Sequence, residues 1–427
     1  MAPALTAHTP TAPHELGAKK AFLNHEAPRH IYPDGIKTSG QHPPLYNQLH
    51  PYEDFPTEIA GPTVWNVEEY KGHPEQWTHV FSDAEIKEIS DTADAFIASG
   101  TPLTGISQET FRLNNFAQFL SVLRKELIDG KGFILFKGLP VQQWGNHKSA
   151  VAYMVRTPHS VPATQLLLCI LTGDVSQGLG THLGYFVSQN AHGHVLGHVK
   201  DLGEDSSAID RVRIYRTNAR QFFHADDADL VGLLCIAKAL EGGESDLVSS
   251  HAVWNALQKE NPDVARTLTE PIWYFDRKGE KSVGEEDWIR TSVFYLEKGA
   301  NPRVYSKWDP YYIRSLTRFS DKGLIPPLSD AQQRATTVLE ETCQRLALHM
   351  ILEVGDIQFL SNNHILHART AYKDFAPPAP RRHLMRLWLS TPEEEGGWKL
   401  PFHDSKEKKR GGIQVNDNPP VAPLDAE

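Results

Sequence analysis

Apolar residues recur at helical spacing in the first third of the chain. Ser82 and Glu85 have the spacing of a capping box, and Gly100 stands where a helix of ordinary length would end. A second helix is indicated by an apolar stripe that stops near Gly130 and comprises Leu113, Phe116, Leu120, Leu123 and Leu127. We expect both stripes to pack into a core rather than to carry chemistry.

Short runs of β-branched and aromatic residues dominate the rest of the chain. They predict strands at residues 132–138, 212–217, 230–240, 292–296, 356–360 and 383–390. One further helix, with Ser329 and Gln332 at capping-box spacing, stands among the later strands. We therefore expect an α+β fold whose core is a double-stranded β-helix, the cupin-like jelly roll, with flanking helices.

The same patterns suggest how the chain is divided. Residues 1–75 are rich in Pro, His and Gly and have little periodicity, which predicts an irregular N-terminal extension. Residues 76–400 are predicted to form a single catalytic jelly-roll domain with a helical buttress. Residues 401–427 are predicted to be a C-terminal tail, which includes the basic run at residues 406–410.

Residues 155–177 (VRTPHSVPATQLLLCILTGDVSQ) interrupt a sequence that otherwise reads smoothly. Our hypothesis is that they are a translated, unspliced intron, because Val-Arg can be encoded by a 5′ splice signal, Leu-Thr by a branch-point sequence and Gln by CAG. The alternative is a variable surface loop. Sequencing the mature transcript distinguishes the two, and neither assigns chemistry to the segment.

Composition narrows the class of protein. The formal net charge of −10 disfavours a nucleic-acid partner, because binding a phosphate backbone requires clustered Lys and Arg. The three cysteines form no CxxC pair, and no run of apolar residues is long enough for a signal peptide core or a membrane span. We therefore expect a cytoplasmic protein without a membrane partner.

The most specific chemical feature is His224-Ala225-Asp226 at the end of a strand-like run. Residues i and i+2 of a strand face the same side, so His224 and Asp226 can hold one cation together. Two imidazoles and one carboxylate leave three facing positions open on Fe(II), although zinc also accepts such a set. A third ligand must come from elsewhere, and His367 is the candidate.

Four segments, taken together, resemble the taurine dioxygenase and clavaminate synthase-like family of Fe(II)/2-oxoglutarate oxygenases over about residues 110–395. The family pattern is HxD, a Gly-Gly-Asp-Thr-like turn, an Asn-rich stretch leading to HxR, and RxxxR. Here the segments read HAD, GGES, NNHILHAR and RHLMR, in the same order. The long N-terminus is similar to that of fungal members, which suggests a role in specialised metabolism.

The resemblance implies a role for each matching residue. His224, Asp226 and His367 correspond to the iron ligands, and Arg382 to the arginine that binds the distal carboxylate of 2-oxoglutarate. Ser245 corresponds to a hydroxyl partner in that pocket, where the family usually has Thr; Ser keeps the hydroxyl and lacks only a methyl group. Arg386 corresponds to the residue that faces the anionic group of the substrate.

The resemblance also implies the reaction: Fe(II), 2-oxoglutarate and O2 together oxidise a small anionic substrate, such as an amino acid or another carboxylate, and release succinate and CO2. Hydroxylation is the default outcome, and desaturation or ring closure are alternatives. Ile357 and Phe359 alternate on the strand before His367, so we expect both to face the substrate. The oligomeric state is not predicted.

Several alternatives remain open at this point. His364 competes with His367 as a ligand, Asp227 competes with Asp226, and the histidines of residues 192–198 form a second cluster without a carboxylate at ligand spacing. The same triad also fits a cupin-like iron oxygenase that does not use 2-oxoglutarate, or a catalytically inactive jelly-roll protein.

Overall fold

The structure is a computed structural model that describes residues 49–426 except 107–109, 112, 114, 155–181, 284, 401–410, 414 and 417. The suspected intron segment, the basic run and most of the predicted N-terminal extension lie outside the described residues. No helix among the described residues is long and apolar enough to cross a membrane.

A seven-stranded sheet forms one side of the core. Its strand order is β1-β2-β14-β6-β17-β3, and β4 also pairs with β17; only β1 and β2 run parallel. The strands are β1 (Thr78–Val80), β2 (Phe133–Lys137), β3 (Tyr185–Phe186), β4 (Leu196–Lys200), β6 (Leu230–Ala237), β14 (Ile357–Ser361) and β17 (His383–Ser390). This large sheet brings strands from both ends of the sequence side by side.

A four-stranded antiparallel sheet forms the other side, in the order β13-β8-β15-β5. Its strands are β5 (Gln221–His224), β8 (Ser245–Ser249), β13 (Leu348–Met350) and β15 (Ile365–Arg369). Three two-stranded pairs complete the strands: β9 (Trp273–Asp276) with β10 (Trp288–Thr291), β11 (Phe294–Leu296) with β12 (Val304–Ser306), and β7 (Glu241–Gly242) with β16 (Tyr372–Lys373).

An apolar cluster joins the two sheets. The large sheet contributes Leu233, Leu360 and Trp388, and the small sheet contributes Leu247 and Ile365. Burial of this surface from both sides stabilises the pairing of the sheets. His367 and Arg386 lie on the same inward faces, because they stand two residues from Ile365 on β15 and from Trp388 on β17.

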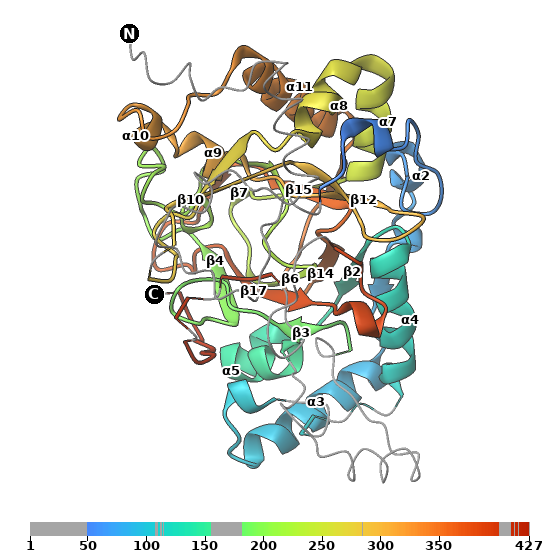
Figure 1. Ribbon diagram of the computed structural model, residues 1–427. Helices are drawn as coiled ribbons and strands as arrows, with labels where there is room; N and C mark the ends of the chain where they lie inside the picture. Colours follow the sequence, from blue (N-terminus) through green and yellow to red (C-terminus); the bar gives the residue numbers. More distant parts are fainter. Residues whose placement is uncertain are drawn as a thin grey trace, which may run out of the picture.

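Helices cover the outer face of each sheet (Figure 1). The large sheet is covered by α3 (Asp83–Ala98), α4 (Phe116–Asp129) and α5 (Val141–Tyr153), and the small sheet by α7 (Ser250–Glu260), α8 (Pro262–Thr269) and α11 (Asp330–Leu346). The remaining α-helices of the described residues are α2 (Val67–Tyr70), α9 (Pro310–Arg314) and α10 (Thr317–Ser320). The chain is thus an α+β protein with helices on both outer faces, as its sequence pattern predicts.

One strand expected from the sequence is not formed. The strand predicted at residues 212–217 is a 3-10 turn at Ile214–Arg216, because Arg213 bonds the Tyr312 hydroxyl and Glu280 and so anchors the segment through side chains rather than through a ladder. The described residues of the predicted C-terminal tail contact the rest of the chain: Val421 bridges to His194, and the Lys200 ammonium meets the Asp425 carboxylate at 2.7 Å.

Candidate metal centre

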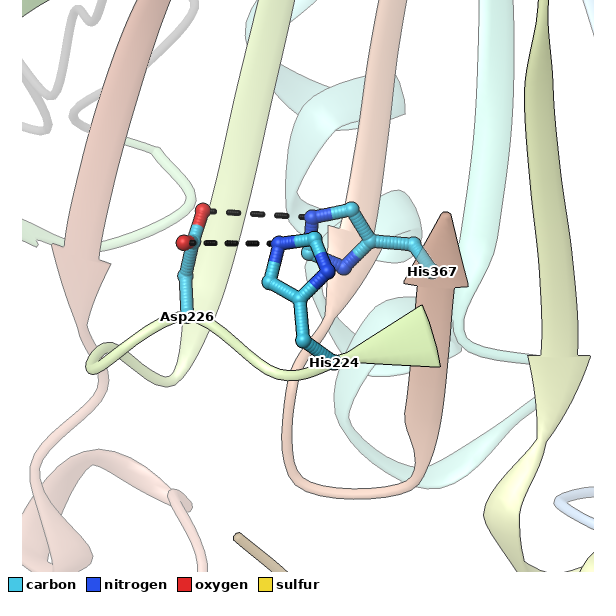
Figure 2. A group of neighbouring side chains, drawn as sticks. All are labelled: His224, Asp226 and His367. Atoms are coloured by element: carbon cyan, nitrogen blue, oxygen red, sulfur yellow. Dashed lines mark ion pairs between the residues drawn. The ribbon is translucent and has the colours of Figure 1, made fainter. Parts of the chain in front are cut away.

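The structure brings His224, Asp226 and His367 together (Figure 2). His224 ends β5, His367 lies opposite it in the antiparallel pairing of β5 with β15, and Asp226 follows on the loop after β5. One ligand atom from each side chain lies within 4.8 Å of the others. Among the described residues, this is the only such cluster, and its donor set suits a divalent first-row metal with open positions.

The imidazoles are held in a state that can donate to a metal. His224 Nδ1 lies 2.9 Å from the Phe222 carbonyl oxygen, which favours Nδ1 as the protonated nitrogen, and the lone pair of Nε2 then faces Asp226 and the Gln221 side-chain nitrogen at 2.9 Å. Burial and the neighbouring His224 lower the pKa of His367 to about 3, so this ring is neutral at physiological pH. The His367 ring can therefore offer a lone pair without competition from protons.

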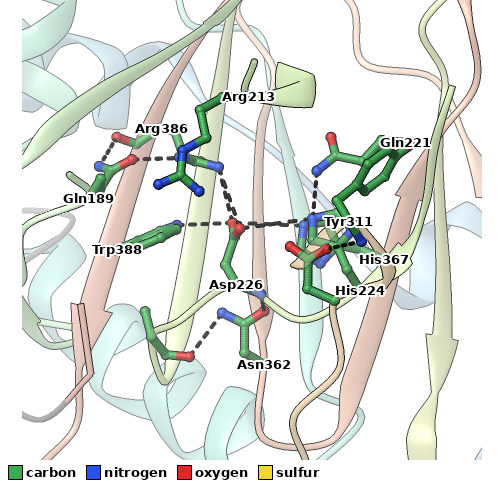
Figure 3. Close-up of polar contacts among 12 residues, drawn as sticks. Gln189, Arg213, Gln221, His224, Asp226, Tyr311, Asn362, His367, Arg386 and Trp388 are labelled. Atoms are coloured by element: carbon green, nitrogen blue, oxygen red, sulfur yellow. Dashed lines mark hydrogen bonds and ion pairs between the residues drawn. The ribbon is translucent and has the colours of Figure 1, made fainter. Parts of the chain in front are cut away.

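Asp226 is held by two side chains from β17 and one from the turn after β14 (Figure 3). Trp388 Nε1 donates to its carboxylate at 2.9 Å, Arg386 Nη1 lies 3.4 Å away, and the Asn362 side-chain oxygen accepts from the Asp226 backbone N–H at 3.1 Å. Burial alone would raise the pKa of Asp226, but Arg386 and the two histidines lower it overall. Asp226 is therefore ionised and preorganised as a ligand.

Two buried arginines, Arg369 and Arg382, lie at the position where the resemblance predicts the distal carboxylate of 2-oxoglutarate. The guanidinium groups of Arg369 and Arg382 stand 4.9 Å and 5.0 Å from the centre of the same Tyr372 ring. Burial lowers the pKa of both, and no hydrogen-bond partner among the described residues reaches Arg382 Nη1 or the Nε and Nη1 atoms of Arg369. Buried guanidinium N–H groups without partners are costly, so this position fits a bound anion such as the distal carboxylate of 2-oxoglutarate.

The Gly-Gly-Glu-Ser turn lies against Arg382. Gly243 has φ +79°, its carbonyl oxygen accepts from Arg382 Nη2 at 2.9 Å, and a Cβ on it would come within 2.6 Å of Arg382 Nε. Ser245 follows on β8, opposite Arg369 in the β8–β15 ladder, and its hydroxyl donates to the Gln358 side-chain oxygen at 3.1 Å. Ser245 and the two arginines thus belong to one end of the sheet pair.

Two predicted substrate residues are not brought to the centre. Ile357 and Phe359 belong to the apolar cluster beneath α3, α4 and α5, and the Phe359 ring contacts Phe136 and Tyr153. The alternation predicted from the strand is correct, but its phase is reversed because the helices cover the face that carries Ile357. The inward-facing residue is Gln358.

The competing residues lie elsewhere. His364 is buried against Trp398, with its ring stacked at 5.5 Å, and its Nε2 faces the Gly130 carbonyl oxygen. Asp227 forms an ion pair with Lys307 at 2.8 Å. His198 pairs with His383 at 2.7 Å. None of them belongs to the cluster that could hold a metal.

Sequence reasoning missed Asn362, Trp388 and Arg369, although all three lie inside the segments it used. The period-two rule carries a signal for Trp388, since it shares a strand face with Arg382 and Arg386. Arg369 shares a strand face with His367 in the same way. Nothing in the sequence shows that Asn362 reaches the loop after β5, because that contact joins residues 136 positions apart.

The fold and the site define a mononuclear oxygenase with two histidines and one carboxylate as metal ligands. The family model described as taurine catabolism dioxygenase TauD, TfdA family, matches residues 99–388. The chain belongs to this family and is an Fe(II)/2-oxoglutarate-dependent dioxygenase. Its cofactor is Fe(II) and its cosubstrate is 2-oxoglutarate.

Two curated relatives and one solved structure extend the comparison. FR-33289 synthase of Streptomyces rubellomurinus is 25% identical over 80% of this chain and 92% of its own length. The taurine hydroxylase-like protein SAT17 of Stachybotrys chartarum is 27% identical over 81% of this chain and 82% of its own. An asparagine oxygenase, solved with Fe(II), 3-hydroxyasparagine and succinate, shares the fold with a TM-score of 0.50 and 14% identity over 74% of this chain and 94% of its own.

Proposed function

We propose that this dioxygenase hydroxylates a small acidic substrate, an amino acid or another carboxylate, with release of succinate and CO2. The observation that carries the proposal is Arg386, which lies beside the metal ligand Asp226 and lines the same cleft. A guanidinium there can hold a carboxylate next to the metal through paired hydrogen bonds. The hydroxylase-like name of the Stachybotrys chartarum relative supports hydroxylation over desaturation or ring closure.

Within this proposal, Arg382 and Ser245 bind the distal carboxylate of 2-oxoglutarate, and Arg369 is a second cation for the same group. The unpartnered N–H groups of the two buried arginines favour this role over an iron oxygenase that does not use 2-oxoglutarate. We further propose that the two facing sheets are a double-stranded β-helix formed by one catalytic domain at residues 76–400. A cytoplasmic location stays a prediction.

When bound, iron and 2-oxoglutarate supply the O2-dependent oxidation of a substrate C–H bond. The protein positions the substrate and the metal ligands and keeps water out of the site. Arg386 orients the acidic group of the substrate, the Phe222 carbonyl fixes the His224 ring, and Trp388 holds Asp226. The apolar cluster between the sheets, to which Trp388 also belongs, keeps water away from the site.

The test is a panel of amino acids and organic acids, with substrate-stimulated succinate release as the readout. Arg382→Met should raise the KM for 2-oxoglutarate by about 100-fold, since a charge-assisted contact is lost. Arg381→Met is the matched control, because Arg381 is exposed and its side chain donates to the Asp201 carbonyl oxygen at 2.7 Å, away from Arg369 and Ser245. Unchanged kinetics of the Arg382 variant would show that 2-oxoglutarate does not bind there.

A further inference from the structure

The cleft beside the metal ligands holds a second cation that the metal chemistry does not use. The cleft has about 400 Å³ of empty space, open solvent included, of which about 30 Å³ admits the centre of a water molecule. Besides Arg386, its lining includes Lys278, which lies in the turn between β9 and β10, and Asp309 and Tyr312 near the start of α9.

Lys278 is held in an unusual way. Its φ of +48° is in the left-handed region that non-glycine residues rarely adopt, and its backbone N–H donates to the Asp276 side chain at 2.7 Å. Its ammonium group donates to the Ile209 carbonyl oxygen at 2.9 Å. Non-glycine residues in this region cluster at functional sites, where the surroundings over-determine them.

In the part of the chain that the structure describes, no carboxylate forms an ion pair with the ammonium of Lys278. Among the described residues, no carboxylate oxygen lies within 4.0 Å of its Nζ, whereas Arg213 in the same cleft is paired with Glu280. Burial above all lowers the pKa of Lys278 to about 8, and Asp309 only partly offsets that effect. A half-buried ammonium with one hydrogen bond to a carbonyl has two further N–H groups to offer.

Arg386 is in a similar position once a metal is bound. The carboxylate within its reach is Asp226, and that group is a metal ligand. A divalent metal takes up the charge of Asp226, which leaves the guanidinium without a full counter-ion. Arg386 and Lys278 are therefore two cations that line one cleft. Among the described residues, the metal ligand Asp226 is the carboxylate that pairs with Arg386, and Asp309, which also lines the cleft, acts on Lys278 from beyond 4.0 Å.

We propose that the substrate carries two negative charges, one facing Arg386 beside the iron and the other facing Lys278. This inference rests on the proposed function and narrows its substrate class. A substrate with two carboxylates and a substrate with one doubly charged phosphate both carry two negative charges. Tyr312, whose ring centre lies 5.5 Å from the Lys278 Nζ, forms part of the wall beside that cation.

The test compares matched acids with one and two charges. L-glutamate is set against L-norvaline, and propyl phosphate against butyrate, with succinate release as the readout. At least one of the two-charge compounds should stimulate succinate release about tenfold or more above its one-charge partner, as expected for one additional charged contact. Which pair responds distinguishes two carboxylates from a phosphate.

The variant Lys278→Met should reduce that preference to about twofold or less, and Lys278→Arg should retain it. Lys281→Met is the matched control, because Lys281 lies on the same hairpin, pairs with Asp287 and does not line the cleft. A preference that survives in Lys278→Met, or no advantage for either two-charge compound, overturns the proposal.

The visible absorption band of the anaerobic iron–2-oxoglutarate complex separates this inference from the function on which it rests. All three lysine variants should keep the band, since Lys278 does not contact the metal ligands. If wild-type protein shows the band but no preference for two charges, only the charge assignment is wrong. If the band does not form, the proposed function is wrong and the charge assignment fails with it.

Discussion

Two adjacent carboxylates show how position decides function at the scale of single residues. Asp226 points to the two histidines and is held by Arg386 and Trp388, whereas Asp227 turns to the surface and pairs with Lys307. The two side chains have the same chemistry and differ only in the side of the loop from which they project.

Asp226→Asn should therefore weaken Fe(II) binding by more than about 100-fold, since even the partners of metal ligands contribute 10- to 100-fold. Asp227→Asn should bind iron as the wild type does. Anaerobic Fe(II) titration followed by calorimetry measures both. Equal losses in the two variants would contradict the assignment of Asp226 as the ligand.

The pH dependence of substrate binding tests Lys278. Its pKa of about 8 results from burial first, with Arg213 and Arg318 lowering it and Asp309 and Asp276 raising it. Because the ammonium exists below this pKa and is lost above it, the KM for an acidic substrate should rise between pH 7 and pH 9. Lys278→Arg should remove the rise, because arginine stays charged. A rise that persists in that variant would assign the titration to another group.

The residues that sequence could and could not place differ in a physical way. His224, Asp226 and His367 follow from strand periodicity and a family pattern, and the structure brings them together. The face that carries Ile357 was assigned wrongly because the period of a strand gives alternation but not phase. The helices that cover one face set the phase, and that is a property of tertiary packing.

At the scale of elements, the strongest local signals were reliable. The capping boxes at Ser82 and Ser329 are both formed, and α3 and α11 begin immediately after them. Helices α7 and α8 were not predicted, although Ser249 caps the first and Pro262 begins the second. Both start signals are present in the sequence, but they stand among strand-like runs that predict β-structure instead.

The Gly-Gly turn after β7 contacts Arg382, the residue that we propose binds 2-oxoglutarate. Gly243→Ala should cost about 1 kcal/mol or more of stability, because its φ is +79°, and should also displace Arg382 and raise the KM for 2-oxoglutarate several-fold. Gly323→Ala is the matched control: its φ is +70°, and a Cβ there meets nothing within 4 Å. It should lose stability alone. Thermal unfolding and 2-oxoglutarate kinetics measure the two effects. An unchanged KM for 2-oxoglutarate in Gly243→Ala would show that the turn does not affect cosubstrate binding.

At the scale of the whole molecule, the C-terminal residues close the structure around the site. The Ile413 N–H donates to the Ser188 carbonyl oxygen at 2.8 Å, next to Gln189, and the Gln189 side-chain oxygen accepts from Arg386 at 2.8 Å. These contacts join residues more than 190 positions apart, so sequence pattern could not predict them. They explain why a segment without periodicity is nevertheless ordered.

Removing the residues from Gly411 onward should lower the Tm by several degrees and raise the KM of the acidic substrate, because the support behind Arg386 is lost. Removing only Asp425, Ala426 and Glu427 should have a much smaller effect, since it removes the exposed pair with Lys200. Thermal unfolding and substrate kinetics compare the two truncations. A full truncation that behaves like the short one would contradict this role of the C-terminus.

The most direct test of the central claim is an anaerobic titration of the full chain with Fe(II) and then with 2-oxoglutarate. We predict one Fe(II) per chain and a visible charge-transfer band that saturates with 2-oxoglutarate, absent in His367→Ala and greatly weakened in Arg382→Met. Folded wild-type protein that binds no iron, or that binds iron but forms no band with 2-oxoglutarate, would contradict the account.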